Sequence, residues 1–276
     1  MGKSITDIQG TFKLNNGINM PYLGLGVFQS ERVTNAVIHA IETGYRHIDT
    51  AAIYNNEVEV GEAIRQSGID RSEIFLVSKV WNTDQGYNST FKAYENSLNR
   101  LKVDYLDLYL IHWPVKNKFI ETWTALEELY KKGKIRAIGV SNFLKHHLDE
   151  LLPNSSIIPM VNQMEFHPYL VQQDLIDFCA KKGIQYEAWS PLMKGKIIDI
   201  ELLKNIALKY SKTTAQVVLR WEIQKGVITI PKSSNPNRIV ENADLFDFEL
   251  STEDMRLIDR LDRNYRVGPD PNNFAF

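Results

Sequence analysis

Residues 74–79 read Ile74-Phe75-Leu76-Val77-Ser78-Lys79, a short apolar run that ends in polar residues. A run of this length and composition is typical of a buried β-strand. Seven further short runs occur at 23–26, 45–48, 108–111, 135–139, 159–162, 185–188 and 227–230. The chain therefore carries eight candidate strands in a regular series.

Segments with the period of an amphipathic helix separate these runs. Apolar residues recur at i, i+3 and i+4 in the stretches 32–43, 91–101, 120–132 and 214–224. Asn235-Pro236 is typical of a helix N-cap followed by proline at the first helical position, and Ser251 with Asp254 resembles a capping box. Glycines fall where helices are expected to stop, at Gly44, Gly133, Gly183 and Gly226.

Strand and helix alternate eight times, which implies an α/β protein with a parallel sheet, and eight such units close naturally into a (β/α)₈ barrel. Residues 11–19, with Asn15-Asn16-Gly17 at their centre, predict a short β-hairpin ahead of the barrel. Residues 264–276 predict a short C-terminal tail.

The length of 276 residues is compatible with one domain or two. No proline-, glycine- or serine-rich linker divides the chain, so we predict a single domain over residues 1–276. The alternative, a doubly wound sheet, requires a G-x-G-x-x-G motif after its first strand. The nearest candidate, residues 24–29, lacks the third glycine and does not open a helix.

Composition excludes several classes of protein. The chain has 43% hydrophobic residues and balances 32 Lys and Arg against 34 Asp and Glu, for a net charge of −2. It shows no basic block for nucleic acid and no apolar run of membrane-span length. The first seven residues lack the apolar core of a signal peptide, and we expect a cytoplasmic protein. The one cysteine, Cys179, lies in an apolar context and is expected in the core.

The C-terminal ends of the strands carry function in this architecture. Asp49 and Tyr54 follow the second run, Lys79 the third and His112 the fourth. Each residue alone has a structural interpretation, as a helix cap, a half-buried aromatic, a solvated charge or a core histidine. Together they suit proton delivery, because an ammonium held by a carboxylate stabilises a phenolate and lowers the pKa of the tyrosine from about 10. The histidine can then orient a carbonyl oxygen beside the hydroxyl, for a general-acid step.

No metal site is expected. The sequence has no H-E-x-x-H motif and no Cys/His cluster. His146 and His147 are adjacent on a probable helix, where neighbouring side chains do not face one metal ion.

Five motifs at five strand ends identify a family. They are residues 44–51 with Tyr54, residues 78–81, residues 110–114, residues 139–143 and residues 230–233. With these motifs the chain resembles the aldo-keto reductases, NADPH-dependent carbonyl reductases on a (β/α)₈ barrel. The resemblance implies that Tyr54 is the general acid/base, that Lys79 and Asp49 lower its pKa, and that His112 orients the substrate.

The resemblance also implies an NADPH site and a substrate pocket. The nicotinamide would be held by Ser141, Asn142, Gln163 and Trp189, and the pyrophosphate by Ser190 and Leu192. The 2′-phosphate and adenine would meet Lys232, Ser233, Ser234, Arg238, Glu241 and Asn242. An anion at the helix opened by Asn235-Pro236 would meet free backbone N–H groups and two cations, so NADPH should be preferred to NADH. The substrate pocket would be lined by Phe28, Trp81, His112 and Trp113.

Two departures point to a subgroup. Eight residues separate His112 from the helix expected near Glu121, where longer family members have an extended loop, and the tail is short. The chain is therefore similar to the compact, mostly microbial members, which include 2,5-diketo-gluconate reductases and glyoxal reductases. With little sequence left for specificity loops, we expect an open mouth and a broad range of carbonyl substrates.

The leading hypothesis is NADPH-dependent reduction of aldehydes, ketones or dicarbonyls, such as methylglyoxal-like compounds or keto-sugars, with Tyr54 as proton donor. We expect a monomer that acts on a small carbonyl substrate. One alternative is a non-catalytic, cofactor-sensing regulatory subunit on the same fold. Another, a metal-dependent barrel hydrolase, requires ligand clusters that the sequence lacks.

Overall fold

The computed structural model describes residues 5–274. In this part of the chain, eight parallel strands form one sheet whose order follows the chain from β3 to β10. The strands are β3 (Leu25–Gly26), β4 (His47–Asp49), β5 (Phe75–Val80), β6 (Leu106–Ile111), β7 (Ile135–Ser141), β8 (Val161–Glu165), β9 (Gln185–Trp189) and β10 (Ile228–Thr229). Parallel bridges from Leu23 to Thr229 and from Gly26 to Lys232 join the first strand to the last. The sheet therefore closes on itself, and the predicted (β/α)₈ barrel is confirmed.

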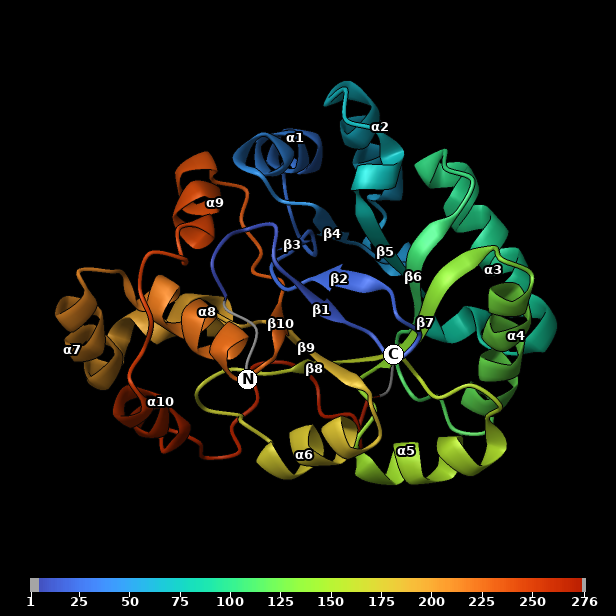
Figure 1. Ribbon diagram of the computed structural model, residues 1–276. Helices are drawn as coiled ribbons and strands as arrows, with labels where there is room; N and C mark the ends of the chain where they lie inside the picture. Colours follow the sequence, from blue (N-terminus) through green and yellow to red (C-terminus); the bar gives the residue numbers. More distant parts are fainter. Residues whose placement is uncertain (1–4, 275–276) are drawn as a thin grey trace.

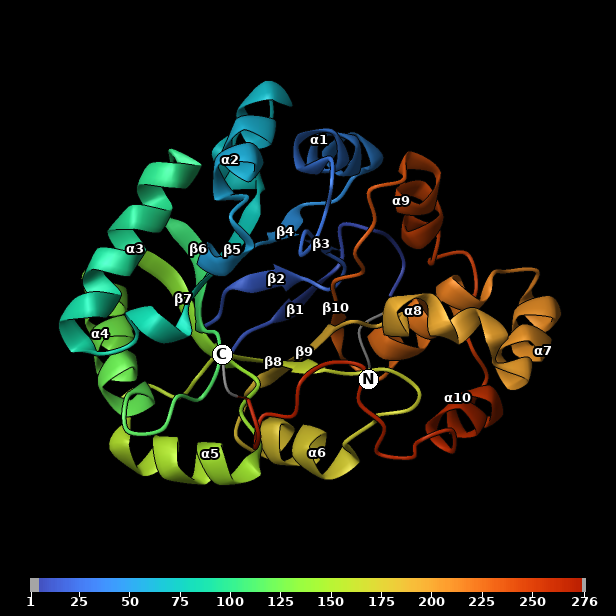
Figure 2. The ribbon, with the colours of Figure 1, turned by 180° about the vertical axis from the view of Figure 1, so that it is seen from behind.

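Helices surround the strands, as Figure 1 and the reverse view in Figure 2 show. The α-helices are α1 (Val33–Thr43), α2 (Glu57–Gln66), α3 (Tyr87–Leu101), α4 (Phe119–Lys131), α5 (Lys145–Leu151), α6 (Gln173–Lys181), α7 (Glu201–Tyr210), α8 (Thr214–Gln224), α9 (Pro236–Ala243) and α10 (Thr252–Asp259). Short 3₁₀ helices are η1 (Ala52–Tyr54), η2 (Arg71–Glu73), η3 (Asn82–Asp84), η4 (Leu152–Asn154) and η5 (Met193–Asp199). The four helical stretches expected from periodicity correspond to α1, α3, α4 and α8. None of the helices in residues 5–274 combines the length and apolar character that a membrane span needs.

The predicted helix ends are confirmed with one exception. The Asn235 side chain accepts hydrogen bonds from the backbone N–H groups of residues 237 and 238, with proline next in the helix. The four predicted stop glycines all have positive φ angles, between 69° and 111°. The capping box at Ser251 forms only in part: Ser251 Oγ accepts from Asp254 N at 3.1 Å, but Ser251 N donates to Tyr210 Oη at 2.9 Å. A tyrosine from the neighbouring α7 therefore supplies the second contact.

The N-terminal hairpin is also confirmed. Its strands, β1 (Thr11–Lys13) and β2 (Asn19–Pro21), pair antiparallel. Gly17, at the turn, has a φ of 91° and donates its N–H to Leu14 O at 2.9 Å. Glycine adopts this left-handed conformation without the steric cost that a Cβ would add.

Five strands, β4, β5, β7, β8 and β9, end later than their apolar runs, and the ends of β8 and β9 lie side by side. The runs end at Asn162 and Ala188, whereas β8 and β9 continue to Glu165 and Trp189, which are direct partners in the sheet. Polar residues interrupt the apolar pattern here, because side chains inside the barrel hydrogen-bond one another. The extension matters for the site described below, since it places a carboxylate beside an indole at the barrel mouth.

The core and the tail complete the fold. Cys179 is buried, and burial raises the pKa of its thiol to about 12, as expected for a core residue. After α10, drawn in red in Figures 1 and 2, the chain returns to the end of β8, where Val267 N donates to Glu165 Oε1. Residues 264–274 contain no helix or strand, so side-chain and backbone contacts with the barrel hold the tail in place.

Candidate active site

Four polar side chains meet where β4, β5 and β6 end. Asp49 is the last residue of β4, Lys79 is next to last in β5, and His112 follows β6. Tyr54 ends η1, which follows β4. The Lys79 Nζ atom lies 2.6 Å from Asp49 Oδ1 and 5.1 Å from the centre of the Tyr54 ring. The Tyr54 and His112 rings are 5.6 Å apart, so the structure brings the four predicted residues together.

The Lys79 ammonium is buried and hydrogen-bonded. Its exposed fraction is 0%, and Nζ donates to Asp49 Oδ1 at 2.6 Å and to the carbonyl oxygen of Thr50 at 2.9 Å. Burial lowers the pKa of Lys79, but the surrounding negative groups, Asp49 first, outweigh burial and raise the pKa overall. Lys79 therefore carries a positive charge at neutral pH.

The pKa of Tyr54 differs from the expectation. Burial is the largest influence and raises the pKa, because a phenolate loses its hydration. Lys79 lowers it through its charge and a hydrogen bond, while Asp49 raises it. The net pKa is raised because burial outweighs Lys79. Lys79 acts in the expected direction, whereas Asp49 acts against it. Asp49 opposes ionisation of the phenol directly and supports it only by holding Lys79. Tyr54 is thus a protonated donor at neutral pH.

His112 is a neutral imidazole beside the tyrosine. Burial and then the charge of Lys79 hold its pKa well below the ordinary value of 6.5. The ring packs edge-on against Trp81 at 5.1 Å. A neutral imidazole has one N–H to donate, so His112 can orient an acceptor oxygen without adding charge.

Aromatic side chains line the mouth around these residues. Phe28 is 50% exposed and its ring lies 4.8 Å from that of Tyr54. Trp113 is only 5% exposed, and its ring lies 5.0 Å from Phe274 in the C-terminal tail. The expectation of an open mouth is therefore wrong on this side, because the short tail still reaches the predicted pocket and covers Trp113.

Comparison with known proteins identifies the family. Residues 8–263 match the Aldo/keto reductase family. This chain belongs to that family. A glyoxal reductase of Bacillus subtilis (strain 168) is 60% identical over 274 residues, which cover 98% of this chain and 99% of the relative. Methylglyoxal reductase DkgA of Escherichia coli O157:H7 is 44% identical over 269 residues, covering 95% of this chain and 97% of the relative. A crystal structure of a Gox0644 mutant in complex with NADPH shows a TM-score of 0.92 at 45% identity, covering 97% of this chain and 99% of that one.

The residues that the reductase resemblance assigns to the nicotinamide form a hydrogen-bonded chain at the ends of β7 to β9. Asn142 has a left-handed backbone with a φ of 64°. Its Nδ2 donates to the carbonyl oxygen of His112 at 3.0 Å, and its Oδ1 accepts from Trp189 Nε1 at 2.9 Å. Ser141 Oγ donates to the carbonyl oxygen of Gln163 at 3.0 Å. These contacts link the indole to the histidine of the active site.

Gln163 connects these residues to Asp49. Its Nε2 donates to Asp49 Oδ2 at 2.8 Å and to Glu187 Oε2 at 2.9 Å. Two acidic side chains therefore occupy the amide nitrogen, which leaves Oε1 as the atom of this side chain available to a ligand.

Glu187 is a residue that the sequence analysis missed. It is fully buried in β9, where it pairs with Gln163, and its Oε1 lies 3.4 Å from His47 Nε2. Burial, followed by repulsion from Asp49, raises the pKa of Glu187 to about 8. Burial lowers the pKa of His47 to about 4. The sequence does contain a sign of this residue. Glu187 is an acidic residue in a predicted strand, two positions before Trp189, and its side chain is therefore on the same face of the strand.

The start of α9 presents the charges that a phosphate needs. Lys232 and Arg238 are exposed, and within residues 5–274 neither forms an ion pair. Ser234 Oγ lies 2.8 Å from Ser30 Oγ, across the junction that closes the barrel. Glu241, one of the two residues predicted near the adenine, accepts a hydrogen bond through Oε1 from Thr213 Oγ1 at 2.9 Å. The other, Asn242, is buried.

The remaining predicted residues lie in loops or away from the site. Ser190 and Leu192 follow β9 and belong to a turn in which the N–H of Met193 donates to Ser190 O at 2.9 Å.

His147 Nδ1 accepts from Leu144 N at 3.1 Å, so this histidine caps α5. Within residues 5–274 the structure contains no group of three His, Cys, Asp or Glu side chains suited to a metal ion.

Proposed function

We propose that this family member reduces small aldehydes, ketones or dicarbonyls, including glyoxal-like and methylglyoxal-like compounds, with NADPH. The observation that carries the proposal is the buried Lys79 ammonium, held by Asp49 at 2.6 Å beside Tyr54 and His112. The names of the glyoxal and methylglyoxal reductases among its relatives support the substrate class.

The residues present fit NADPH. Lys232 and Arg238 are cations without ion-pair partners in the described part of the chain, beside the first turn of α9, which suits the 2′-phosphate. Ser141, Asn142, Gln163 and Trp189 would hold the nicotinamide, and Ser190 and Leu192 the pyrophosphate. When bound, NADPH supplies a hydride to the carbonyl carbon. The related structure in complex with NADPH supports this choice of cofactor.

Tyr54 would supply the proton. As the carbonyl oxygen gains negative charge, the Tyr54 hydroxyl transfers its proton to that oxygen and the product is an alcohol. The phenolate left behind lies beside the Lys79 ammonium, which stabilises it until a proton from solvent restores the hydroxyl. The neutral His112 would donate a hydrogen bond to the same oxygen and orient it toward Tyr54. Phe28 and Trp81 would exclude water from one side of the carbonyl.

Tyr54→Phe tests this assignment, because it removes the hydroxyl and keeps the ring. We expect turnover to fall by about 10²- to 10⁴-fold, the usual contribution of a general acid, while NADPH binding changes little. NADPH oxidation with methylglyoxal and phenylglyoxal measures turnover, and cofactor fluorescence measures binding.

Tyr87→Phe is the matched control, since the Tyr87 hydroxyl donates to Glu128 on the outer surface. Unchanged turnover in Tyr54→Phe would refute the assignment. Binding of NADPH without turnover in the unmodified protein would instead favour the cofactor-sensing regulatory subunit.

A further inference from the structure

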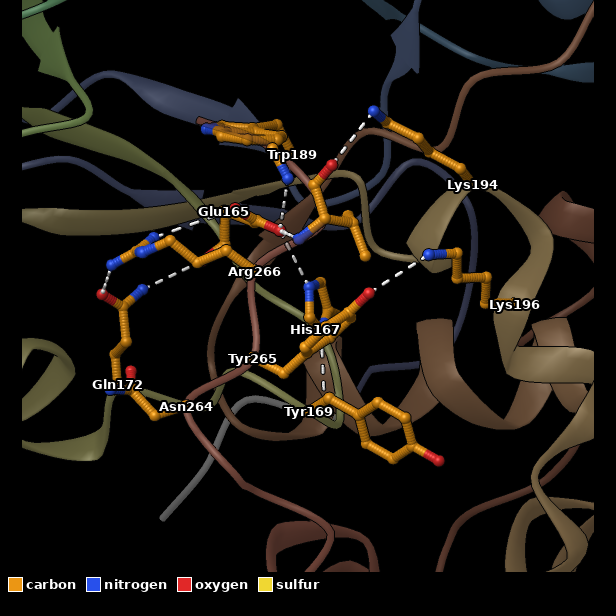
Figure 3. Close-up of polar contacts among 12 residues, drawn as sticks. Glu165, His167, Tyr169, Gln172, Trp189, Lys194, Lys196, Asn264, Tyr265 and Arg266 are labelled. Atoms are coloured by element: carbon orange, nitrogen blue, oxygen red, sulfur yellow. Dashed lines mark hydrogen bonds and ion pairs between the residues drawn. The ribbon is translucent and has the colours of Figure 1, made fainter. Parts of the chain in front are cut away.

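Another buried acidic residue lies at the mouth of the barrel, two residues beyond Gln163 in β8. Glu165 ends β8, has an exposed fraction of 0% and pairs directly with Trp189 in β9. It contacts none of the four catalytic side chains described above. Figure 3 shows that its carboxylate is instead directed at the C-terminal tail.

One oxygen of Glu165 collects three hydrogen bonds. Oε1 accepts from the backbone N–H of Val267 at 2.5 Å, from that of Gly268 at 3.2 Å, and from His167 Nε2 at 3.0 Å (Figure 3). The other nitrogen of His167 accepts from Tyr169 N at 3.3 Å, which fixes the ring proton on the side of the carboxylate. The barrel thus presents a buried acceptor that takes two successive N–H groups of the tail.

Arg266 reinforces this connection. Its Nη1 lies 3.8 Å from Glu165 Oε2, and its Nη2 donates to Gln172 Oε1 at 3.0 Å. Gln172 in turn donates from Nε2 to the carbonyl oxygen of Glu165 at 3.0 Å. The tail is therefore fastened to one residue of β8 through both its side chain and its backbone.

The fastened tail rests on Trp189. A Cβ added to Gly268 would lie 2.3 Å from Cη2 of the indole and 3.4 Å from Glu165 Oε2. Position 268 therefore requires glycine, because the backbone of the tail lies directly against the indole ring. The opposite edge of the indole donates to Asn142 Oδ1 at 2.9 Å, so the ring is fixed on two sides.

Tyr265 N donates to the backbone oxygen of Tyr169 at 2.9 Å, and two further contacts of this part of the tail are made by lysine side chains. Lys194 Nζ donates to the carbonyl oxygen of Val267 at 3.1 Å, and Lys196 Nζ lies 3.2 Å from Tyr265 Oη (Figure 3). Both lysines belong to η5 and are exposed. Exposed polar contacts of long side chains contribute little. Glu165 is therefore the buried side chain that anchors residues 267 and 268.

We propose that Glu165 is a positioning residue that holds the C-terminal tail against Trp189 and so fixes the indole face available to the nicotinamide. The carboxylate acts through Val267 and Gly268 rather than by touching substrate or cofactor. The last part of this inference, concerning the nicotinamide, rests on the proposed function, whereas the placement of Trp189 does not.

The test observes Trp189 in the full-length protein without cofactor. Protein labelled with 5-fluorotryptophan gives a ¹⁹F resonance for each indole, and Trp189→Phe assigns the one of interest. We expect Glu165→Ala and Gly268→Ala each to shift and broaden the Trp189 resonance, the first by releasing the tail and the second by pushing on the ring. The resonance of the core residue Trp123 should not change. Lys196→Met, which removes an outer contact of the same tail, is the matched control.

Cofactor binding provides the second readout. Glu165→Ala should weaken NADP⁺ binding about tenfold, as expected for the loss of a charged hydrogen bond, and should raise the KM for NADPH more than it lowers kcat. Glu165→Gln keeps one acceptor oxygen and should recover part of the loss.

A Trp189 resonance in Glu165→Ala and Gly268→Ala equal to that in Lys196→Met would overturn the proposal. If Glu165→Ala fails to fold, Gly268→Ala still tests the contact from the tail side. If the unmodified protein does not bind NADP⁺, the proposed function fails, while the resonance still decides whether Glu165 places Trp189.

Discussion

At the ends of β7 to β9, Asn142 and Gln163 are buried and hydrogen-bonded to neighbouring side chains, whereas at the start of α9, Lys232 and Arg238 are exposed and form no ion pair within residues 5–274. The two regions are expected to hold opposite ends of one dinucleotide. The buried end has its geometry set before any ligand arrives, as preorganised sites require. The exposed end offers charge without fixed partners. We therefore expect the buried end to control chemistry and the exposed end to control affinity and choice of cofactor.

Lys79→Met should have the largest effect, because it acts at the buried end. It leaves Asp49 buried without its cation, which costs about 3 to 5 kcal/mol of stability, and it removes the charge that stabilises the Tyr54 phenolate. Turnover should fall by about 10²-fold or more. Urea unfolding and carbonyl reduction measure the two effects.

The double variant Asp49→Asn/Lys79→Met separates the effect on stability from the effect on turnover, since it should recover stability without recovering turnover. Lys145→Met, which breaks an exposed pair with Asp149, is the control and should change stability by less than about 1 kcal/mol. A Lys79→Met protein with unchanged stability and turnover would contradict the claim that the buried end controls the chemistry.

Glu187→Gln should have an intermediate effect with a characteristic pH dependence. The pKa of Glu187 is raised to about 8 in the folded protein, against about 4.3 in an unfolded chain. The unfolded state therefore loses this proton at lower pH than the folded state, and stability falls as pH rises between the two values. The advantage of Glu187→Gln over the unmodified protein should grow from about pH 4.3 to about pH 8, reach a few kcal/mol and then level off.

Chemical denaturation of both proteins at each pH measures this difference. Glu62→Gln, on the exterior of α2, is the control and should track the unmodified protein. A constant difference across the range would show that Glu187 is ionised in the fold at neutral pH.

Lys232→Ala and Arg238→Ala should have the smallest effect, confined to the exposed end. Each removes one charge near the expected 2′-phosphate and should weaken NADPH binding by about tenfold, with kcat nearly unchanged. NADH, which lacks this phosphate, should bind as before. Added salt should weaken NADPH binding to the unmodified protein more than to the double variant, since exposed charges are screened. Equal losses of affinity for NADPH and NADH would argue against a 2′-phosphate site. Lys204→Ala, which removes a surface lysine elsewhere, is the control and should leave the affinity for both cofactors unchanged.

The sequence was informative wherever a residue type has a fixed local consequence. Glycine at a helix end, asparagine before proline and an apolar run ending in Lys79 each predicted a feature that the structure contains. That Asp49, Tyr54, Lys79 and His112 lie together could be predicted because barrel strands converge at one end.

The rest depends on contacts between distant parts of the chain. The pKa of Tyr54 is set by desolvation, which no local pattern reveals. Glu187 lies inside a predicted strand and Glu165 just beyond another, but neither could be assigned a role because their partners lie elsewhere in the sequence. That the chain is one domain, acts as a monomer and lies in the cytoplasm remain predictions.

The tail has a consequence for how a protein of this kind can change over evolutionary time. Its attachment point, Arg266 to Gly268, precedes Phe274, the residue that packs against Trp113 at the pocket. Under the proposed function, substitutions of Phe274 would alter which substrates fit while the attachment, and the indole that it contacts, stay unchanged. Selection would then act on substrate range and on cofactor geometry through separate positions of one short segment.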